Sequence, residues 1–130
     1  MARVLGIDYG TRRIGIALSN EDGSFAFPYA ILSKDKNVLD KIRSLCQKEK
    51  ISLIVLGLPR ALDGGETEMT HKVLQFRNEL GGLGVPMALE NEFFSSKEAR
   101  RAPLKKKHVD ASAAAIVLQS YLDRKKAMLE

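Results

Sequence analysis

Three acidic residues lie far apart in the chain at positions from which a fold could bring their carboxylates together. Asp8 lies in a strand-like run near the N-terminus, Glu92 follows an apolar run, and Asp110 precedes an alanine-rich helical segment. Carboxylates that converge at one edge of a sheet offer the hard oxygen ligands that Mg²⁺ and Mn²⁺ prefer. Because such ions catalyse phosphodiester hydrolysis, the pattern predicts a metal site for that chemistry.

Each of these acidic residues also has a structural alternative. Asp8 could accept hydrogen bonds from the amides of the following turn, and Asp110 is a favoured helix N-cap whose charge suits the helix dipole. Glu90 lies two residues before Glu92 and faces the same side of a strand, so either could be the ligand. The alternative for Glu90 is a solvated strand end.

The elements that must position these residues follow from hydrophobic periodicity and turn signals. Strands are expected at 3–9, 14–18, 25–32, 51–56 and 85–89. Helices are expected at 38–46, 69–80, 95–101 and 110–128, with a loop at 57–65. The first three strands should form an antiparallel meander that feeds two right-handed crossovers. The predicted fold class is therefore α/β, with a mixed five-stranded sheet and helices on both faces.

Size and composition indicate one ordinary globular domain over residues 1–130. The net charge of +5 and the sequence pI near 9.4 favour a polyanionic partner, although charge alone is a weak signal. Cys46 is the single cysteine, which excludes an intramolecular disulfide and a cysteine-based zinc site. The chain has neither a run of about 20 apolar residues nor a signal-peptide pattern, so we expect no membrane association and a cytoplasmic location.

Basic residues and their neighbours suggest where a phosphate backbone would lie. One cluster precedes Asp110 and borders the predicted metal site, so phosphate contacts are expected from Lys97, Arg100, Arg101, Lys105, Lys106 and Lys107. Thr11, Arg12 and Arg60 lie on loops near the same sheet edge and are further candidates. A second cluster, Arg124, Lys125 and Lys126, is interpreted as a solvated surface. Contacts of this kind give affinity without base specificity.

Four segments stand in order along nearly the whole chain. They are Gly-Ile-Asp-Tyr-Gly-Thr-Arg-Arg-Ile-Gly-Ile-Ala-Leu-Ser (6–19), Gly-Leu-Pro (57–59) with Asp-Gly (63–64), Phe-Ser-Ser-Lys-Glu-Ala-Arg (94–100), and Val-Asp-Ala-Ser-Ala-Ala-Ala-Ile-Val-Leu-Gln-Ser-Tyr-Leu (109–122). These segments resemble the motifs of the YqgF family, which are Holliday-junction-resolvase-like proteins. The resemblance implies an RNase H-like nuclease whose catalytic carboxylates fall on Asp8, Glu92 and Asp110. These residues would hold Mg²⁺ or Mn²⁺ as a two-ion site bridged by Asp8.

Two departures from the family pattern bear on activity. Glu92 stands between Asn91 and Phe93, where the family usually has Asp-Glu-Arg, and the segment 100–109 is shorter than in the family. The main expectation is a metal-dependent endonuclease that processes the 5′ end of pre-16S ribosomal RNA or cleaves branched, Holliday-junction-type DNA. The alternative is a weakly active or inactive nucleic-acid-binding protein of ribosome biogenesis.

Other properties stay open at the level of sequence. The chain does not discriminate between structured RNA and branched DNA as partner, nor between a monomer and a homodimer, although junction resolution requires two active sites. The run that begins at Asp8 also resembles the phosphate loop of sugar kinases and actin-like ATPases. Those proteins use two domains, so 130 residues make this alternative weaker.

Overall fold

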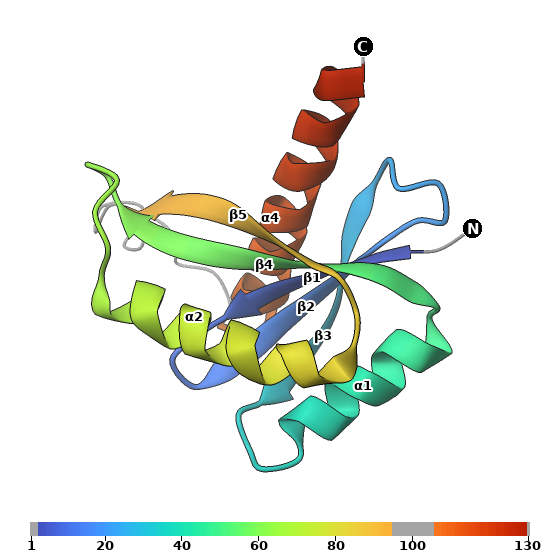
Figure 1. Cartoon of the computed structure of the whole chain (residues 1–130), viewed down its shortest axis with the longest axis horizontal. Helices are drawn as coiled ribbons and strands as arrows, with labels where there is room; N and C mark the ends of the chain where they lie inside the picture. Colours follow the sequence, from blue (N-terminus) through green and yellow to red (C-terminus); the bar gives the residue numbers. More distant parts are fainter. Residues whose placement is uncertain (1–2, 95–105, 130) are drawn as a thin grey trace.

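The computed structural model of the chain describes residues 3–94 and 106–129. Its elements in chain order are β1 (Arg3–Tyr9), β2 (Arg13–Ser19), β3 (Ala26–Ser33), α1 (Val38–Lys48), β4 (Ile51–Ala61), α2 (Glu68–Leu80), the short 3₁₀ helix η1 (Gly81–Leu83), β5 (Met87–Phe94) and α4 (Lys106–Leu129) (Figure 1). The helix expected at 95–101 lies outside the described residues. None of the helices in the described part of the chain combines the length and apolar character needed to cross a bilayer.

The strands of the described residues form one five-stranded sheet in the order β3-β2-β1-β4-β5. β1 pairs with β2 and β2 pairs with β3 in antiparallel register, whereas β4 pairs in parallel with both β1 and β5. The predicted meander with two added parallel strands is therefore confirmed. The carboxyl ends of β1, β4 and β5 lie at the same edge of the sheet.

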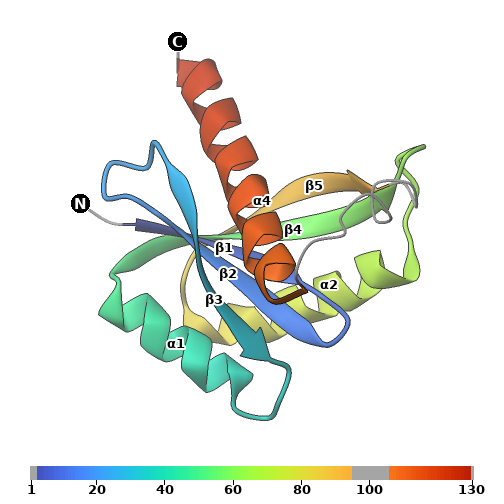
Figure 2. The ribbon, with the colours of Figure 1, turned by 180° about the vertical axis from the view of Figure 1, so that it is seen from behind.

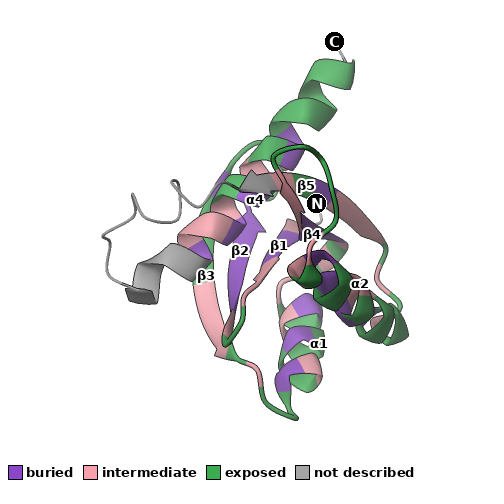
Figure 3. Cartoon of the chain, turned by 90° about the vertical axis from the view of Figure 1, so that its left-hand side faces the viewer, coloured by how far each residue is buried: buried purple, intermediate pink, exposed green. Residues whose placement is uncertain are grey.

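Helices cover both faces of the sheet, as the sequence predicted. α1 and α2 lie on one face and α4 lies across the other (Figures 1 and 2). Leu5 and Ile7 of β1 are fully buried in the core on the α1 and α2 face. Residues of β1 that alternate with them face α4. Buried residues are concentrated on the strands between the helices (Figure 3).

Small residues allow α4 to lie close to the sheet. A Cβ atom at Gly6 would stand 2.8 Å from Leu118 Cβ and 3.1 Å from the carbonyl oxygen of Ala114. The core on this face also includes Ala17, Ala26 and Ala114, and the partly buried Ala88 and Ala115 pack against it. The helix is therefore in direct contact with the backbone of β1.

The strands β4 and β5 are longer than predicted. β4 runs on to Ala61 through Gly57 and Pro59, which the sequence placed in a loop, and β5 runs on to Phe94. The two strands pair with each other over this whole extension, from Gly57 opposite Glu90 to Ala61 opposite Phe94. Pro59 is compatible with the strand because the pairing of β1 with β4 ends at Leu56, so that side of β4 has no ladder to break.

Helix α4 begins at Lys106, four residues before the predicted start at Asp110. Asp110 therefore lies within the first turns of the helix and does not occupy the N-cap position that was its structural alternative.

Candidate active site

The carboxyl groups of Asp8 and Glu92 come together at the carboxyl edge of the sheet. Ile7 of β1 pairs with Leu56 of β4, so Asp8 lies level with Gly57 on the intervening strand. A Cβ atom at Gly57 would stand only 2.7 Å from Glu92 Oε2. Gly57 thus leaves the space through which the Glu92 side chain reaches across β4 toward Asp8.

The Asp8–Glu92 pair is destabilised as a pair of charges. Burial, the negative charge of Asp8 and a hydrogen bond between the two side chains raise the pKa of Glu92 to about 8. Without a cation, the raised pKa of Glu92 favours its protonated form beside Asp8 at neutral pH. A divalent cation would replace that proton and remove the repulsion.

These observations fit a hard divalent cation. The donor atoms are carboxylate oxygens, and the missing side chain at Gly57 keeps the space around Glu92 open. The described residues contain no cluster of three His, Cys, Asp or Glu side chains. The side chain of Asp110, the third predicted ligand, lies outside what the structure describes, so its role stays a prediction.

A cleft of about 680 Å³ opens beside the carboxyl pair. Its lining residues are Asp8, Tyr9, Gly10, Thr11, Pro59, Arg60, Ala61, Thr67, Met69 and Glu92. Two predicted phosphate contacts, Thr11 and Arg60, therefore share a cleft with two predicted ligands. Arg12 is exposed on the adjoining turn.

Asn91, one of the departures from the family pattern, contacts Arg60. The Arg60 Nε–H donates to Asn91 Oδ1 at 3.1 Å, and Arg60 Nη1 donates to the carbonyl oxygen of Gly64 at 3.3 Å. Because the amide acceptor is neutral, it orients the guanidinium without cancelling its charge. This contact was not predicted, since no local pattern connects positions 60 and 91.

Glu90 has a different environment from Glu92. It is only 7% exposed, accepts a hydrogen bond from Ser120 Oγ at 2.9 Å, and forms an ion pair with Arg124 at 2.5 Å. The alternative of a solvated strand end for Glu90 is therefore wrong, and Arg124, interpreted as part of a solvated surface, is half exposed but also pairs with Glu90. Glu90 is engaged by α4, whereas Glu92 is the glutamate that lies with Asp8.

The remaining predicted phosphate contacts are not placed. Lys97, Arg100, Arg101 and Lys105 lie outside the described residues. Lys106 and Lys107 lie on the first turn of α4, and their side chains are outside what the structure describes.

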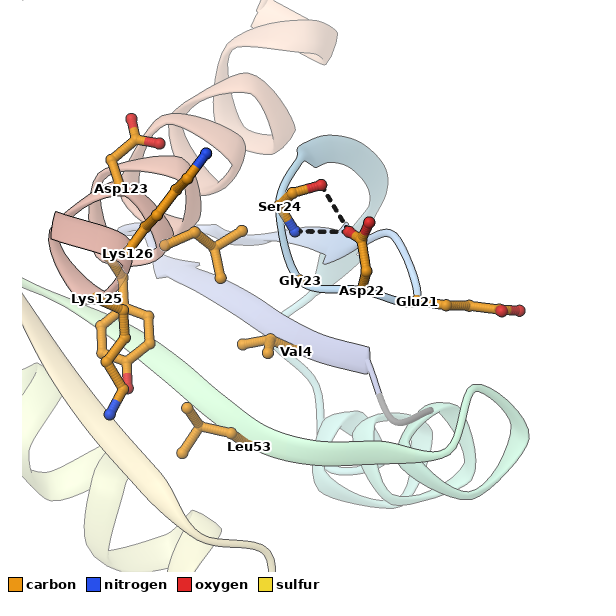
Figure 4. A pocket seen from close by; sticks show the side chains of 11 residues that line it. Val4, Glu21, Asp22, Gly23, Ser24, Leu53, Asp123, Lys125 and Lys126 are labelled. Atoms are coloured by element: carbon orange, nitrogen blue, oxygen red, sulfur yellow. Dashed lines mark hydrogen bonds between the residues drawn. The ribbon is translucent and has the colours of Figure 1, made fainter. Parts of the chain in front are cut away.

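The C-terminal lysines lie elsewhere. Lys125 and Lys126 border a hollow of about 670 Å³ that has Val4 and Leu53 on its floor and the 21–24 turn on its far side (Figure 4). Val4 and Leu53 belong to the amino-terminal halves of β1 and β4. These lysines therefore flank the end of the sheet opposite to the carboxyl pair.

Comparisons with known proteins identify a matching family and similar sequences. A family model described as RuvX, Holliday junction resolvase, matches residues 2–124. A protein of Maridesulfovibrio salexigens provisionally named pre-16S rRNA nuclease is 36% identical over 133 residues, covering 94% of this chain and 98% of its own length. A protein of Sulfurihydrogenibium sp. strain YO3AOP1 with the same provisional name is 37% identical over 134 residues, covering 95% and 92%.

Solved structures with a similar fold include two proteins in complex with Holliday junctions. RuvC of Thermus thermophilus in complex with a Holliday junction substrate has a TM-score of 0.57 at 14% identity, covering 97% of this chain and 96% of that chain. The fowlpox virus resolvase in complex with substrate Holliday junction DNA has a TM-score of 0.59 at 12% identity, covering 94% and 97%. The likeness to these structures establishes the RNase H-like fold.

Proposed function

Because this chain belongs to the RuvX family of Holliday junction resolvases, we propose that residues 1–130 are a single divalent-metal-dependent nuclease domain. The observation that carries the proposal is the Asp8–Glu92 carboxyl pair, whose side chains are hydrogen-bonded to each other at the edge of the sheet and line a cleft. Two half-buried carboxyl groups held this close are costly as a pair of charges unless a cation or a proton lies between them.

We assign the ligand role to Asp8, Glu92 and Asp110. Mg²⁺ or Mn²⁺ held there, as one ion or two, would supply an activated water and charge neutralisation for phosphodiester hydrolysis. Asp8 and Glu92 would bind as carboxylates, so Glu92 must release its proton on loading. Arg60, oriented by Asn91, would attract the phosphate backbone into the cleft.

The preferred substrate is the precursor of 16S ribosomal RNA, because relatives at 36–37% identity over nearly their whole length carry that name. The reaction would then take place in the cytoplasm. A four-way DNA junction is the second candidate, supported by the description of the matching family model. Junction cleavage would require a homodimer, whereas RNA processing is compatible with a monomer.

The competing proposal is a protein that binds nucleic acid without cutting it. It is supported by Asn91 and Phe93, which replace charged residues usual in the family. The Asp8–Glu92 pair favours the nuclease, since a pure binding protein has no need for two adjoining half-buried carboxyl groups beside a phosphate site.

The test is cleavage of end-labelled pre-16S RNA and of a synthetic four-way DNA junction, with Mn²⁺ or with EDTA. We expect metal-dependent cutting of the RNA by the wild type and its loss in Asp8→Asn. Asp40→Asn, the same change on the exposed side of α1, is the matched control and should retain full activity.

Each outcome separates the alternatives. Preferential cutting of the junction would reassign the substrate. Binding of RNA without any metal-dependent cutting would establish the binding protein. Equal traces of cutting in the wild type and Asp8→Asn would identify a contaminating nuclease and refute the assignment of Asp8.

A further inference from the structure

The turn between β1 and β2 is held in place by a lysine from another part of the chain. Lys34, directly after β3, donates from Nζ to the carbonyl oxygens of Gly10 at 3.0 Å and Thr11 at 3.1 Å. The same Nζ lies 4.0 Å from the centroid of the Tyr9 ring. The ammonium group is thus occupied by two carbonyls and an aromatic face, all on residues 9–11.

This lysine fixes the direction of two consecutive peptide groups. In a planar trans peptide the C=O and N–H bonds point in opposite directions, and the described residues contain no cis peptide. Because the carbonyls of Gly10 and Thr11 point toward Lys34, the N–H groups of Thr11 and Arg12 point away from it. Neither N–H donates to another group within the described part of the chain, whereas the Gly10 N–H donates to the Arg13 carbonyl at 2.9 Å.

The same turn adjoins the cleft. Gly10 and Thr11 line the cleft together with Asp8 and Glu92, and Lys34 is not among the lining residues. Successive N–H groups that point in one direction form an anion-binding concavity. Here that concavity begins three residues after Asp8, the first of the carboxylates.

We propose that the amides of Thr11 and Arg12 bind a phosphate oxygen of the polynucleotide, and that Lys34 is the positioning residue that aims them. The assignment of this phosphate to the substrate rests on the proposed nuclease function. The amides hold the phosphate beside the carboxyl pair without reading the base, and Lys34 acts through the carbonyls of the turn without touching the phosphate.

The first test uses the ¹⁵N-labelled wild-type protein in EDTA, titrated separately with sodium phosphate and with a ten-nucleotide uridine RNA. We expect the amide resonances of Thr11 and Arg12 to shift with both probes. The amide of Gly23, in the turn at the other end of the sheet, serves as the internal control and should not shift. This measurement needs no variant, so it holds even if a substitution unfolds the protein.

The second test compares Lys34→Met with Lys36→Met. Both remove one positive charge from the same segment, but Lys36 is exposed and has no hydrogen bond to the turn. We expect Lys34→Met to weaken RNA binding about tenfold, the value of one charge-assisted hydrogen bond, and to abolish the Thr11 and Arg12 shifts. Lys36→Met should weaken binding less than about threefold, as for one distant charge.

The dependence of binding on salt distinguishes positioning from direct contact. If Lys34 only aims the amides, log Kd against log salt should have the same slope in both lysine variants. If Lys34 contacts a phosphate directly, the salt slope measured for Lys34→Met should instead be smaller than that for Lys36→Met. The expected difference is about 0.7, the contribution of one phosphate contact on a single strand. That result, or equal loss of affinity in the two variants, would overturn the positioning role.

The outcomes also separate this site from the nuclease itself. Absence of Thr11 and Arg12 shifts with both probes would overturn the phosphate site, even if the wild type cuts RNA in Mn²⁺. Shifts of both amides without any metal-dependent cutting would support the site and contradict the nuclease.

Discussion

The clearest quantitative consequence of the carboxyl pair is a stability cost in the metal-free protein. Replacing Glu92 by Gln keeps the shape of the side chain and its capacity to donate a hydrogen bond to Asp8, but it removes the titration. The pKa of Glu92 is raised from 4.5 to about 8 in the folded protein. Its protonation therefore supports folding fully below pH 4.5, and this contribution is lost as the pH rises from 4.5 to about 8.

The interval between 4.5 and about 8 corresponds to about 5 kcal/mol at roughly 1.4 kcal/mol per pH unit. This free energy is an upper limit, because water that enters the open cleft stabilises the charged form of Glu92. We expect about half of it to be realised. Glu92→Gln should then exceed the wild type in free energy of unfolding by about 2–3 kcal/mol at pH 8.5, with little difference at pH 4.5. In a chain of this length, each kcal/mol of unfolding free energy shifts the Tm by roughly 3 °C.

The assay is urea unfolding followed by circular dichroism, in EDTA, at several pH values between 4.5 and 8.5. Glu79→Gln is the matched control, because Glu79 is exposed on α2 and the same change there should alter the unfolding free energy by less than about 0.5 kcal/mol. A difference between Glu92→Gln and wild type that is independent of pH, or a less stable Glu92→Gln at pH 8.5, would refute the reasoning. Added MgCl₂ should stabilise the wild type and not Glu92→Gln.

Three further substitutions test the packing around the site. Gly57→Ala places a methyl group 2.7 Å from the Glu92 carboxylate, so metal-dependent cleavage should fall about 100-fold while the circular dichroism spectrum stays native. Unchanged cleavage would show that the Glu92 side chain moves freely. Gly6→Ala brings a methyl to 2.8 Å from a side-chain carbon of α4 and should lower the unfolding free energy by about 1–3 kcal/mol in urea titrations; no loss would mean that the helix shifts without cost. Arg124→Met leaves the buried Glu90 carboxylate without its ion pair and should lower the Tm, with partial recovery when Glu90→Gln is added; additive effects of the two changes would refute the pairing.

The order of elements and the sheet topology followed from the sequence because the signals are local. Turn residues separate the first three strands, and helical periodicity separates the parallel ones. The connection rules for short turns and right-handed crossovers then leave few arrangements. The convergence of Asp8 and Glu92 could be anticipated for the same reason, since both lie at the carboxyl ends of strands.

The extensions of β4 and β5 could not be predicted because they depend on partners. Gly57 and Pro59 are poor strand formers, so their local signal indicates a loop. Their strand conformation comes from pairing with β5, and the glycine is required by the space that Glu92 occupies. Neither influence can be read from the residues around position 57.

The choice between Glu90 and Glu92 was likewise beyond local reasoning. Alternation places both side chains on the face covered by α4, where either could be the ligand. Arg124, 34 residues after Glu90, engages that glutamate and leaves Glu92 to Asp8. Lys34 gave no signal either, because it approaches the β1–β2 turn only once β3 has folded back along β2.

The small residues under α4 imply that the two faces of the sheet tolerate sequence drift differently. On the face packed by α1 and α2, branched aliphatic residues can exchange with one another while the core volume is preserved. Under α4, any larger side chain at Gly6 or at the neighbouring alanines would push the helix away from the sheet. In a random library selected only for solubility, substitutions should accumulate under α1 and α2, whereas selection for cleavage should purge almost every enlargement under the helix that carries Asp110.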